Sequence, residues 1–255
     1  MPQSLACPVV VAALKERIRR LEGGAARARA VLPFGVAAID GRLPGGGLAL
    51  GCLHEVAGGG ADTVANAVDG AAATLFAAGI AARTGGKVLW CVARQDLFAP
   101  ALAQAGLPAD RVVHAEAGDD RDLLACFEEG LRHGGLGAVV AEVSRLPMTA
   151  SRRLQLAAES SGTVGLALRR WRRPTEAAGY AQPTASVTRW RVSALPSAPL
   201  PVPGVGRPRW LLELVRCRAG EAAMFEVEAC DGEGRLALSA DGPSREEDRR
   251  RVAAA

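Results

Sequence analysis

The chain has 255 residues, 49% of them hydrophobic, with 31 basic against 27 acidic side chains and a formal net charge of +4. No apolar run approaches the roughly 20 residues that cross a bilayer, and no basic residues precede the short apolar stretch near the N-terminus, so neither a membrane protein nor a secreted one is expected. Because only Lys15 and Lys87 are lysines, the positive charge is almost all arginine. The arginines fit either a surface for phosphates or nucleic acid, or a genome that favours arginine and alanine codons. The abundant alanine supports the codon bias, so only the placement of the arginines is informative.

The cysteines and histidines indicate a reduced protein without a metal. The six cysteines never form a CxxC pair, and the three histidines are scattered. Cysteines in apolar surroundings behave as small hydrophobic side chains when reduced. We therefore expect a cytoplasmic location, with association with the nucleoid as an extension, and neither a metal site nor a cofactor.

Residues 8–22 are predicted to form a helix. Pro8 suits its first turn, and Leu14, Ile18 and Leu21 form one apolar stripe opposite basic residues. Glycines then separate this segment from the rest, so residues 1–30 are assigned to an N-terminal arm and linker. The stripe fits packing on the chain's own core, on a neighbouring copy or on a partner.

From residue 31 onwards, apolar strands alternate with helices. Strands are predicted at 52–57, 87–93, 111–117, 136–143 and 163–171, and helices at 61–84, 98–106, 119–133 and 147–162. Asp119 and Asp120 suit the positive end of their helix, and Gly162 suits a helix C-terminus. Continuous apolar strands between helices predict an α/β fold with a mostly parallel sheet covered on both faces.

After Trp171 the helices stop. Residues 172–184 and the proline-rich segment 196–208 are predicted loops, and 185–195 a strand. Residues 209–220 and 222–238 alternate like antiparallel strands, with a turn at 231–234. The core domain is therefore assigned to 31–240, and the charged residues 241–255 to a disordered tail.

Three glycines, Gly58, Gly59 and Gly60, lie between an apolar strand and a helical pattern, where a phosphate-binding loop would sit. Such a loop needs a lysine and then Ser or Thr. In the frame that begins at Gly58, the glycine, lysine and hydroxyl positions hold Thr63, Val64 and Ala65, and the other frames also lack the lysine. The segment fits a structural turn, a weak non-hydrolytic nucleotide site or, least well, a hydrolytic one.

Two carboxylates resemble the remaining parts of a nucleotide site. Glu142 ends a buried strand, where a magnesium-placing carboxylate is expected, and Asp96 follows the strand at 87–93, where an acid would orient the attacking water. Gly58, Gly59, Gly60, Thr63 and Glu142 are thus assigned to a vestigial nucleotide loop, with no catalytic residue.

The run "LPFGVAAIDGRLPGGGLALGCLHEVAG" resembles the opening of a RecA-type ATPase core. The order of the later strands matches as well, over roughly residues 31 to 240. With a degenerate glycine loop and an arginine-rich N-terminal segment "ERIRRLEGG", the chain is most similar to the ImuA family, and the division inhibitor SulA is a related alternative.

The resemblance implies a RecA-like core with C-terminal antiparallel strands and a non-enzymatic role in DNA-damage-induced (SOS) translesion mutagenesis. The implied partners are an ImuB-like polymerase homologue, an error-prone polymerase of the replicative type, and RecA; no membrane is involved. A SulA-like role would instead mean binding the tubulin-like division protein. A divergent DNA-dependent ATPase also stays open.

The cluster "RRWRRP" is the candidate contact surface, because arginines neutralise phosphates and an aromatic ring stacks on an unpaired base. In a RecA-like core this loop faces single-stranded DNA, and an N-terminal helix packs on a neighbouring protomer. A protein contact, or a solvated loop with its tryptophan on the core edge, fits too, and Trp190 on the next strand lies between two further arginines. The predicted DNA or partner contacts are Arg169, Arg170, Trp171, Arg172 and Arg173, and the predicted protein interface is Leu14, Ile18 and Leu21.

Overall fold

The structure is a computed structural model that describes residues 30–59, 67–171, 177–198, 200, 202–204 and 206–239. The predicted N-terminal helix at 8–22 and the tail at 241–255 lie outside the described residues, so the assigned domain boundaries stay predictions. In the described part of the chain, no helix is long and apolar enough to cross a membrane.

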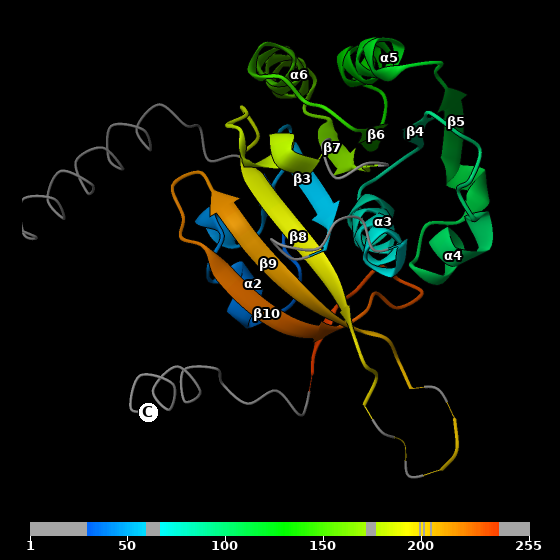
Figure 1. The fold of residues 1–255 in the computed structure, drawn as a ribbon. Coiled ribbons are helices and arrows are strands. Elements are labelled where there is room, and N and C mark those ends of the chain that lie inside the picture. Colours follow the sequence, from blue (N-terminus) through cyan, green and yellow to red (C-terminus); the bar gives the residue numbers. More distant parts are fainter. Residues whose placement is uncertain are drawn as a thin grey trace, which may run out of the picture.

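Nine strands of the described residues form one sheet in the order β11-β10-β9-β8-β3-β7-β6-β4-β5 (Figure 1). Strands β5, β4, β6, β7, β3 and β8 run parallel to their neighbours, and β9, β10 and β11 continue the sheet antiparallel from β8. This confirms the predicted mostly parallel sheet with C-terminal antiparallel strands. The strand bounds are β3 Leu53–Gly58, β4 Val88–Val92, β5 Val112–Glu116, β6 Ala138–Val143, β7 Val164–Arg169, β8 Thr188–Leu195, β9 Arg209–Cys217, β10 Ala223–Glu228 and β11 Ala237–Leu238.

Helices cover both faces of the parallel part (Figure 1). Alternate residues of β6 divide between two cores: Val140 packs in the cluster that includes α3, and Val139 packs in the cluster that includes α5 and α6. Because both faces are buried, the strand reads as a continuous apolar run rather than an alternating one. The helices are α3 Ala67–Ala82, α4 Ala99–Gln104, α5 Asp120–His133 and α6 Met148–Ser161.

The helix ends follow the predicted signals. Asp119 is the N-cap of α5, and its carboxylate accepts hydrogen bonds from the backbone N–H groups of Arg121 and Asp122. Gly162 ends α6 with a left-handed φ of 79°. These caps satisfy backbone groups that have no partner inside the helix.

The segment before β3 forms a small layer of its own. Strands β1 Val31–Leu32 and β2 Leu48–Ala49 pair antiparallel, and α2 Ala37–Asp40 and the 3-10 turn η1 Pro44–Gly46 lie between them. Phe34 packs on Phe76 of α3, with ring centroids 5.9 Å apart, and on Trp190 of β8 at 5.7 Å. Two further 3-10 turns, η2 Ala109–Arg111 and η3 Ala178–Ala181, precede β5 and β8, and η3 falls in the segment predicted as loop.

A buried hydrogen-bonded chain fixes the beginning of β3 to its neighbours. The Nδ1 atom of His54 lies 2.8 Å from the Thr188 hydroxyl, and its Nε2 lies 2.8 Å from the carbonyl of Ala49. Since a carbonyl only accepts, Nε2 carries the proton and Nδ1 accepts from Thr188, whose oxygen accepts from the Trp190 indole at 2.9 Å. Burial lowers the pKa of His54 to about 4, so the ring is neutral at pH 7.

Candidate functional site

The glycines at the end of β3 have structural reasons to be glycine. A Cβ on Gly58 would lie 2.6 Å from the backbone carbonyl carbon and oxygen of Asp69, so β3 touches the first turn of α3. Gly59 has a φ of 81°, and its N–H donates to the carbonyl of Val192 at 3.1 Å. The close approach and the left-handed φ both require glycine. The other loop residues of the prediction, Gly60 and Thr63, lie outside the described residues.

The described residues hold one lysine, and it is far from this loop. Lys87 directly precedes β4, at the opposite end of that strand from Asp96, and its Nζ donates to the carbonyl of Asp110. It therefore lies at the edge of the sheet where the parallel strands begin. Ligands of open α/β sheets bind at the other edge, where the strands end.

The two predicted carboxylates do come together, and an arginine joins them. Nη1 of Arg170 donates to Oδ1 of Asp96 at 2.8 Å and to Oε2 of Glu142 at 2.6 Å, while Nη2 donates to Oδ2 of Asp96 at 3.0 Å. The second oxygen of Glu142 accepts from the indole of Trp90 at 3.1 Å. All four carboxylate oxygens therefore have a donor.

The electrostatics favour the ionised forms of Asp96 and Arg170. The side chain of Glu142 is 5% exposed, whereas those of Arg170 and Asp96 are 39% and 48% exposed. The hydrogen bond from Arg170 holds the pKa of Asp96 below its usual range, and the hydrogen bond to Asp96 raises the pKa of Arg170. A metal ion at this place would have to displace a guanidinium that is already ion-paired with both acids.

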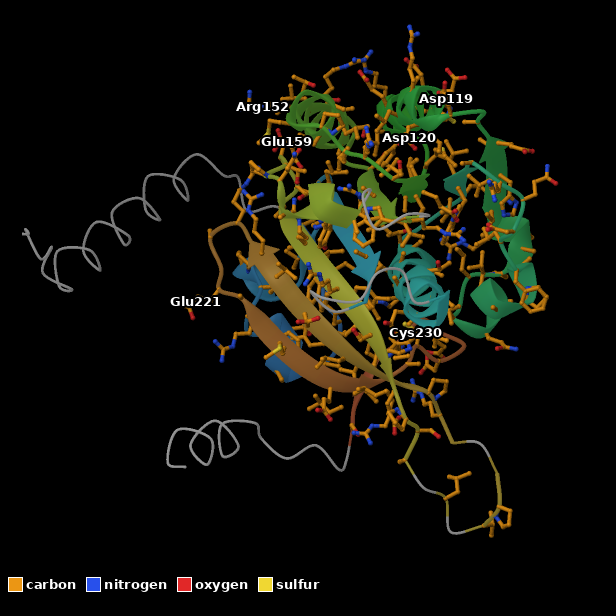
Figure 2. The ribbon with its side chains drawn as sticks, viewed as in Figure 1. Asp119, Asp120, Arg152, Glu159, Glu221 and Cys230 are labelled. Atoms are coloured by element: carbon orange, nitrogen blue, oxygen red, sulfur yellow. The ribbon has the colours of Figure 1, made fainter. Side chains whose placement is uncertain are left out.

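Two cavities of about 380 Å³ each flank the Arg170 side chain. The first is mostly apolar and lies between the ends of β3 and β7 and the helices α3 and α4, with Leu75, Phe98 and Trp171 among its walls. The second is polar and reaches the start of α5, where Figure 2 labels Asp119 and Asp120. This edge of the sheet thus offers an apolar cavity and an acidic one, which share Arg170, Asp96 and Trp171 as walls.

Arg169, the neighbour of Arg170, points to the opposite face of the sheet. Its Nη1 donates to Glu55 of β3 at 3.0 Å, and the side chains are 2% and 0% exposed. Arg189 of β8 binds the same carboxylate at 3.1 Å, and the hydroxyls of Thr184 and Ser186 donate to it. Burial alone would raise the pKa of Glu55, but these partners, Arg189 foremost, hold it below its usual range.

This network places part of the predicted contact cluster inside the protein. Arg169 is buried and paired, so it presents no charge at the surface, and its predicted contact with DNA or a partner would need a rearrangement. Trp171 is half-buried: its indole donates to the carbonyl of Ser144 at 3.2 Å, and its ring packs on Tyr180 at 5.2 Å. Arg172 and Arg173 lie outside the described residues, as do Leu14, Ile18 and Leu21.

The buried network around Glu55 was not predicted, although one feature of the sequence indicates it. Glu55 interrupts an apolar strand, and a charge in a strand buried on both faces requires partners. Trp190 also lies inside the core rather than beside a surface cluster, with Arg189 turned into the network and the ring fully buried. Within the described residues, no three His, Cys, Asp or Glu side chains group as metal ligands would.

Comparison with known proteins shows the family and the fold of the chain. No family model matches it. Over 215 residues it is 41% identical to Protein ImuA of two strains of Caulobacter vibrioides, which covers 82% of this chain and 87% of each relative. The crystal structure of the RadB recombinase superposes with a TM-score of 0.53 at 17% identity, covering 80% of this chain and 98% of the other, which confirms the RecA-like fold and concerns the fold alone. By its identity to these relatives, the chain belongs to the ImuA family.

Proposed function

We propose that this protein is a non-catalytic RecA-like adaptor in DNA-damage-induced (SOS) translesion mutagenesis. Membership of the ImuA family supports a place in that system. The observation that carries the non-catalytic role is Arg170, whose guanidinium binds both carboxylates of the vestigial nucleotide site.

The physical argument concerns the cations that phosphoryl transfer requires. A metal ion bridges the terminal phosphates and is held by carboxylates, while a lysine cradles the same phosphates. In this chain the glycine loop has no lysine in any frame, and Arg170 fixes Asp96 and Glu142 in ion pairs. The chain therefore has a RecA-like fold without the means to stabilise the charge of a phosphoryl-transfer transition state. The lysine is absent, and the carboxylates that would hold the metal ion are ion-paired with Arg170.

An adaptor acts through its surfaces. We infer that its partners are an ImuB-like polymerase homologue, an error-prone polymerase of the replicative type and RecA. The apolar stripe of Leu14, Ile18 and Leu21 is the proposed protein interface, since an amphipathic helix buries such a stripe against a groove of its partner.

We propose single-stranded DNA as a further ligand, bound by the segment that follows β7. Two arginines there, Arg172 and Arg173, come directly after Trp171, which the structure leaves half-buried. The test is fluorescence anisotropy with a labelled oligonucleotide at several salt concentrations. The variant Arg172→Ala/Arg173→Ala should weaken binding and flatten its salt dependence, because fewer counterions are released. The matched control Arg121→Ala/Arg152→Ala removes the same charge from exposed positions on α5 and α6 and should bind as the unmodified protein does.

Phosphate release decides between an adaptor and a divergent ATPase. We expect no release above background from ATP and magnesium, with or without single-stranded DNA. DNA-stimulated release that disappears in Glu142→Gln would overturn the adaptor proposal. Co-purification with the ImuB-like polymerase homologue and the error-prone polymerase supports the proposal. Selective binding of the tubulin-like division protein would support a SulA-like role instead.

A further inference from the structure

Two cysteines that are distant in sequence meet between the sheet and a helix. Cys91 lies on β4 and is fully buried, and Cys126 lies on α5 and is half-buried. Their Sγ atoms are 3.4 Å apart, and the Cys91 thiol is placed to donate to the Cys126 sulfur. A disulfide needs a separation of about 2.05 Å, so the sulfurs would have to approach each other by about 1.3 Å.

The close approach of α5 to β4 explains the contact. Gly130 follows Cys126 by four residues and therefore lies on the same face of α5. A Cβ on Gly130 would lie 2.5 Å from Cδ2 of Leu89, which precedes Cys91 by two residues on β4. Because glycine has no side chain, α5 packs close to β4, and this close packing brings the two thiols together.

The two thiols differ in their access to small molecules. Cys126 lines a surface cavity of about 480 Å³, together with Leu89, Gly130, Leu136 and the polar residues Glu129, Arg132 and His133. Cys91 lies behind it, and burial raises the pKa of its thiol. An oxidant from solvent therefore reaches Cys126 first, and Cys91 is placed as the resolving thiol.

We propose that Cys91 and Cys126 form a reversible disulfide when the protein meets hydrogen peroxide. The Cys126 thiolate attacks one peroxide oxygen, the O–O bond breaks, and hydroxide leaves to be protonated to water, which gives a sulfenic acid. The Cys91 sulfur then attacks the Cys126 sulfur while its proton passes to the sulfenic oxygen, so the S–O bond breaks and water leaves. In total two thiols and one peroxide give one disulfide and two waters, with the thiols oxidised and the peroxide reduced.

The cross-link would fasten the elements around the carboxylate and arginine triad. Strand β4 ends at Val92, shortly before Asp96, and α5 begins with Asp120 at the wall of the polar cavity. A bond from β4 to α5 restricts both the unfolded chain and the relative movement of these two elements. Oxidation therefore raises thermal stability and stiffens this edge of the sheet.

The test is peptide mass spectrometry on the full-length protein in a Cys7→Ser background, after graded hydrogen peroxide and blocking of the remaining thiols. We expect a cross-linked peptide pair containing Cys91 and Cys126 that dithiothreitol reverses, with a raised melting temperature in the oxidised form. In Cys91→Ser, dimedone should trap a sulfenic acid at Cys126. In Cys126→Ser, Cys91 should stay reduced, and the control Cys217→Ser should cross-link normally.

Three results would overturn the proposal. The first is that folded protein with both Cys91 and Cys126 present is treated with peroxide and still shows all of its free thiols when they are counted after denaturation. The second is a cross-link that involves different cysteines. The third is that Cys91 oxidises as readily in Cys126→Ser as Cys126 does in Cys91→Ser. The first result needs no substitution at either cysteine, so it holds even if a variant fails to fold.

Discussion

The stability of the protein should fall between pH 7 and pH 5 because of a single buried histidine. His54 has an ordinary pKa of 6.5 when exposed and a pKa of about 4 in the folded protein. Between these values the unfolded chain binds a proton at His54 that the folded chain does not bind. Acid therefore favours unfolding, and stability rises with pH across this window.

The size of the effect follows from the two pKa values. Linkage gives a loss of about 2 kcal/mol in the free energy of unfolding between pH 7 and pH 5, and about 3 kcal/mol by pH 4. The carboxylates with lowered pKa, Glu55, Asp96 and Asp231, lose their contributions only as pH falls through their own lower pKa values. The interval from pH 7 to pH 5 therefore isolates the histidine.

The assay is urea unfolding at pH 7, 6 and 5, followed by the fluorescence of the buried tryptophans. The variant His54→Gln keeps a donor for the Ala49 carbonyl and cannot titrate, so its stability should be nearly flat over this interval, although lower at pH 7. The control His114→Gln changes an exposed histidine of β5 and should keep the slope of the unmodified protein. A His54→Gln protein that loses the same free energy as the unmodified protein would refute the buried, neutral histidine.

Two further pairs of substitutions test the packing of the site, each by urea unfolding. Gly58→Ala places a Cβ 2.6 Å from backbone atoms of α3, so it should lower the free energy of unfolding by at least about 2 kcal/mol. Its control Gly70→Ala enters open space on α3 and should raise the free energy of unfolding by about 0.5–1 kcal/mol. Equal effects of the two would contradict the close approach. Arg169→Met leaves Glu55 buried with one arginine fewer and should lower the free energy of unfolding by about 3 kcal/mol. Its control, the exposed Arg152→Met, should change it by no more than about 0.5 kcal/mol. A loss for Arg169→Met as small as that for Arg152→Met would mean that the buried pair is not formed.

Much of the fold was predictable because its signals are local. The first four residues of the segment "AVVAEV" are apolar on both faces, which indicates a strand covered by two layers, and β6 is buried at every position. Asp119 and Gly162 mark helix ends through backbone geometry that depends on few neighbours. The small layer of β1, β2 and α2 has no comparable signal in the sequence, because two-residue strands carry no periodicity.

The site was less predictable because it depends on strand register. Glu142 lies opposite Leu168 in the pairing of β6 with β7. Because of this register, Arg170, which follows the end of β7, lies within reach of the Glu142 carboxylate. The sequence shows adjacent arginines at 169 and 170 and gives no means to assign one to each face. The partner of Glu55 is likewise one choice among many arginines until the pairing of β3 with β7 and β8 is known.

The most direct test of the account is a titration of a fluorescent ATP analogue with magnesium against the purified full-length protein. If Arg170 holds Asp96 and Glu142 in ion pairs and the loop lacks its lysine, no saturable binding should occur up to about millimolar ligand, the range of very weak sites. Binding at micromolar ligand that depends on magnesium and is lost in Glu142→Gln would show that the carboxylates remain available to a metal. That result would contradict the ion-paired triad on which the non-catalytic proposal rests, and it would reopen the divergent ATPase.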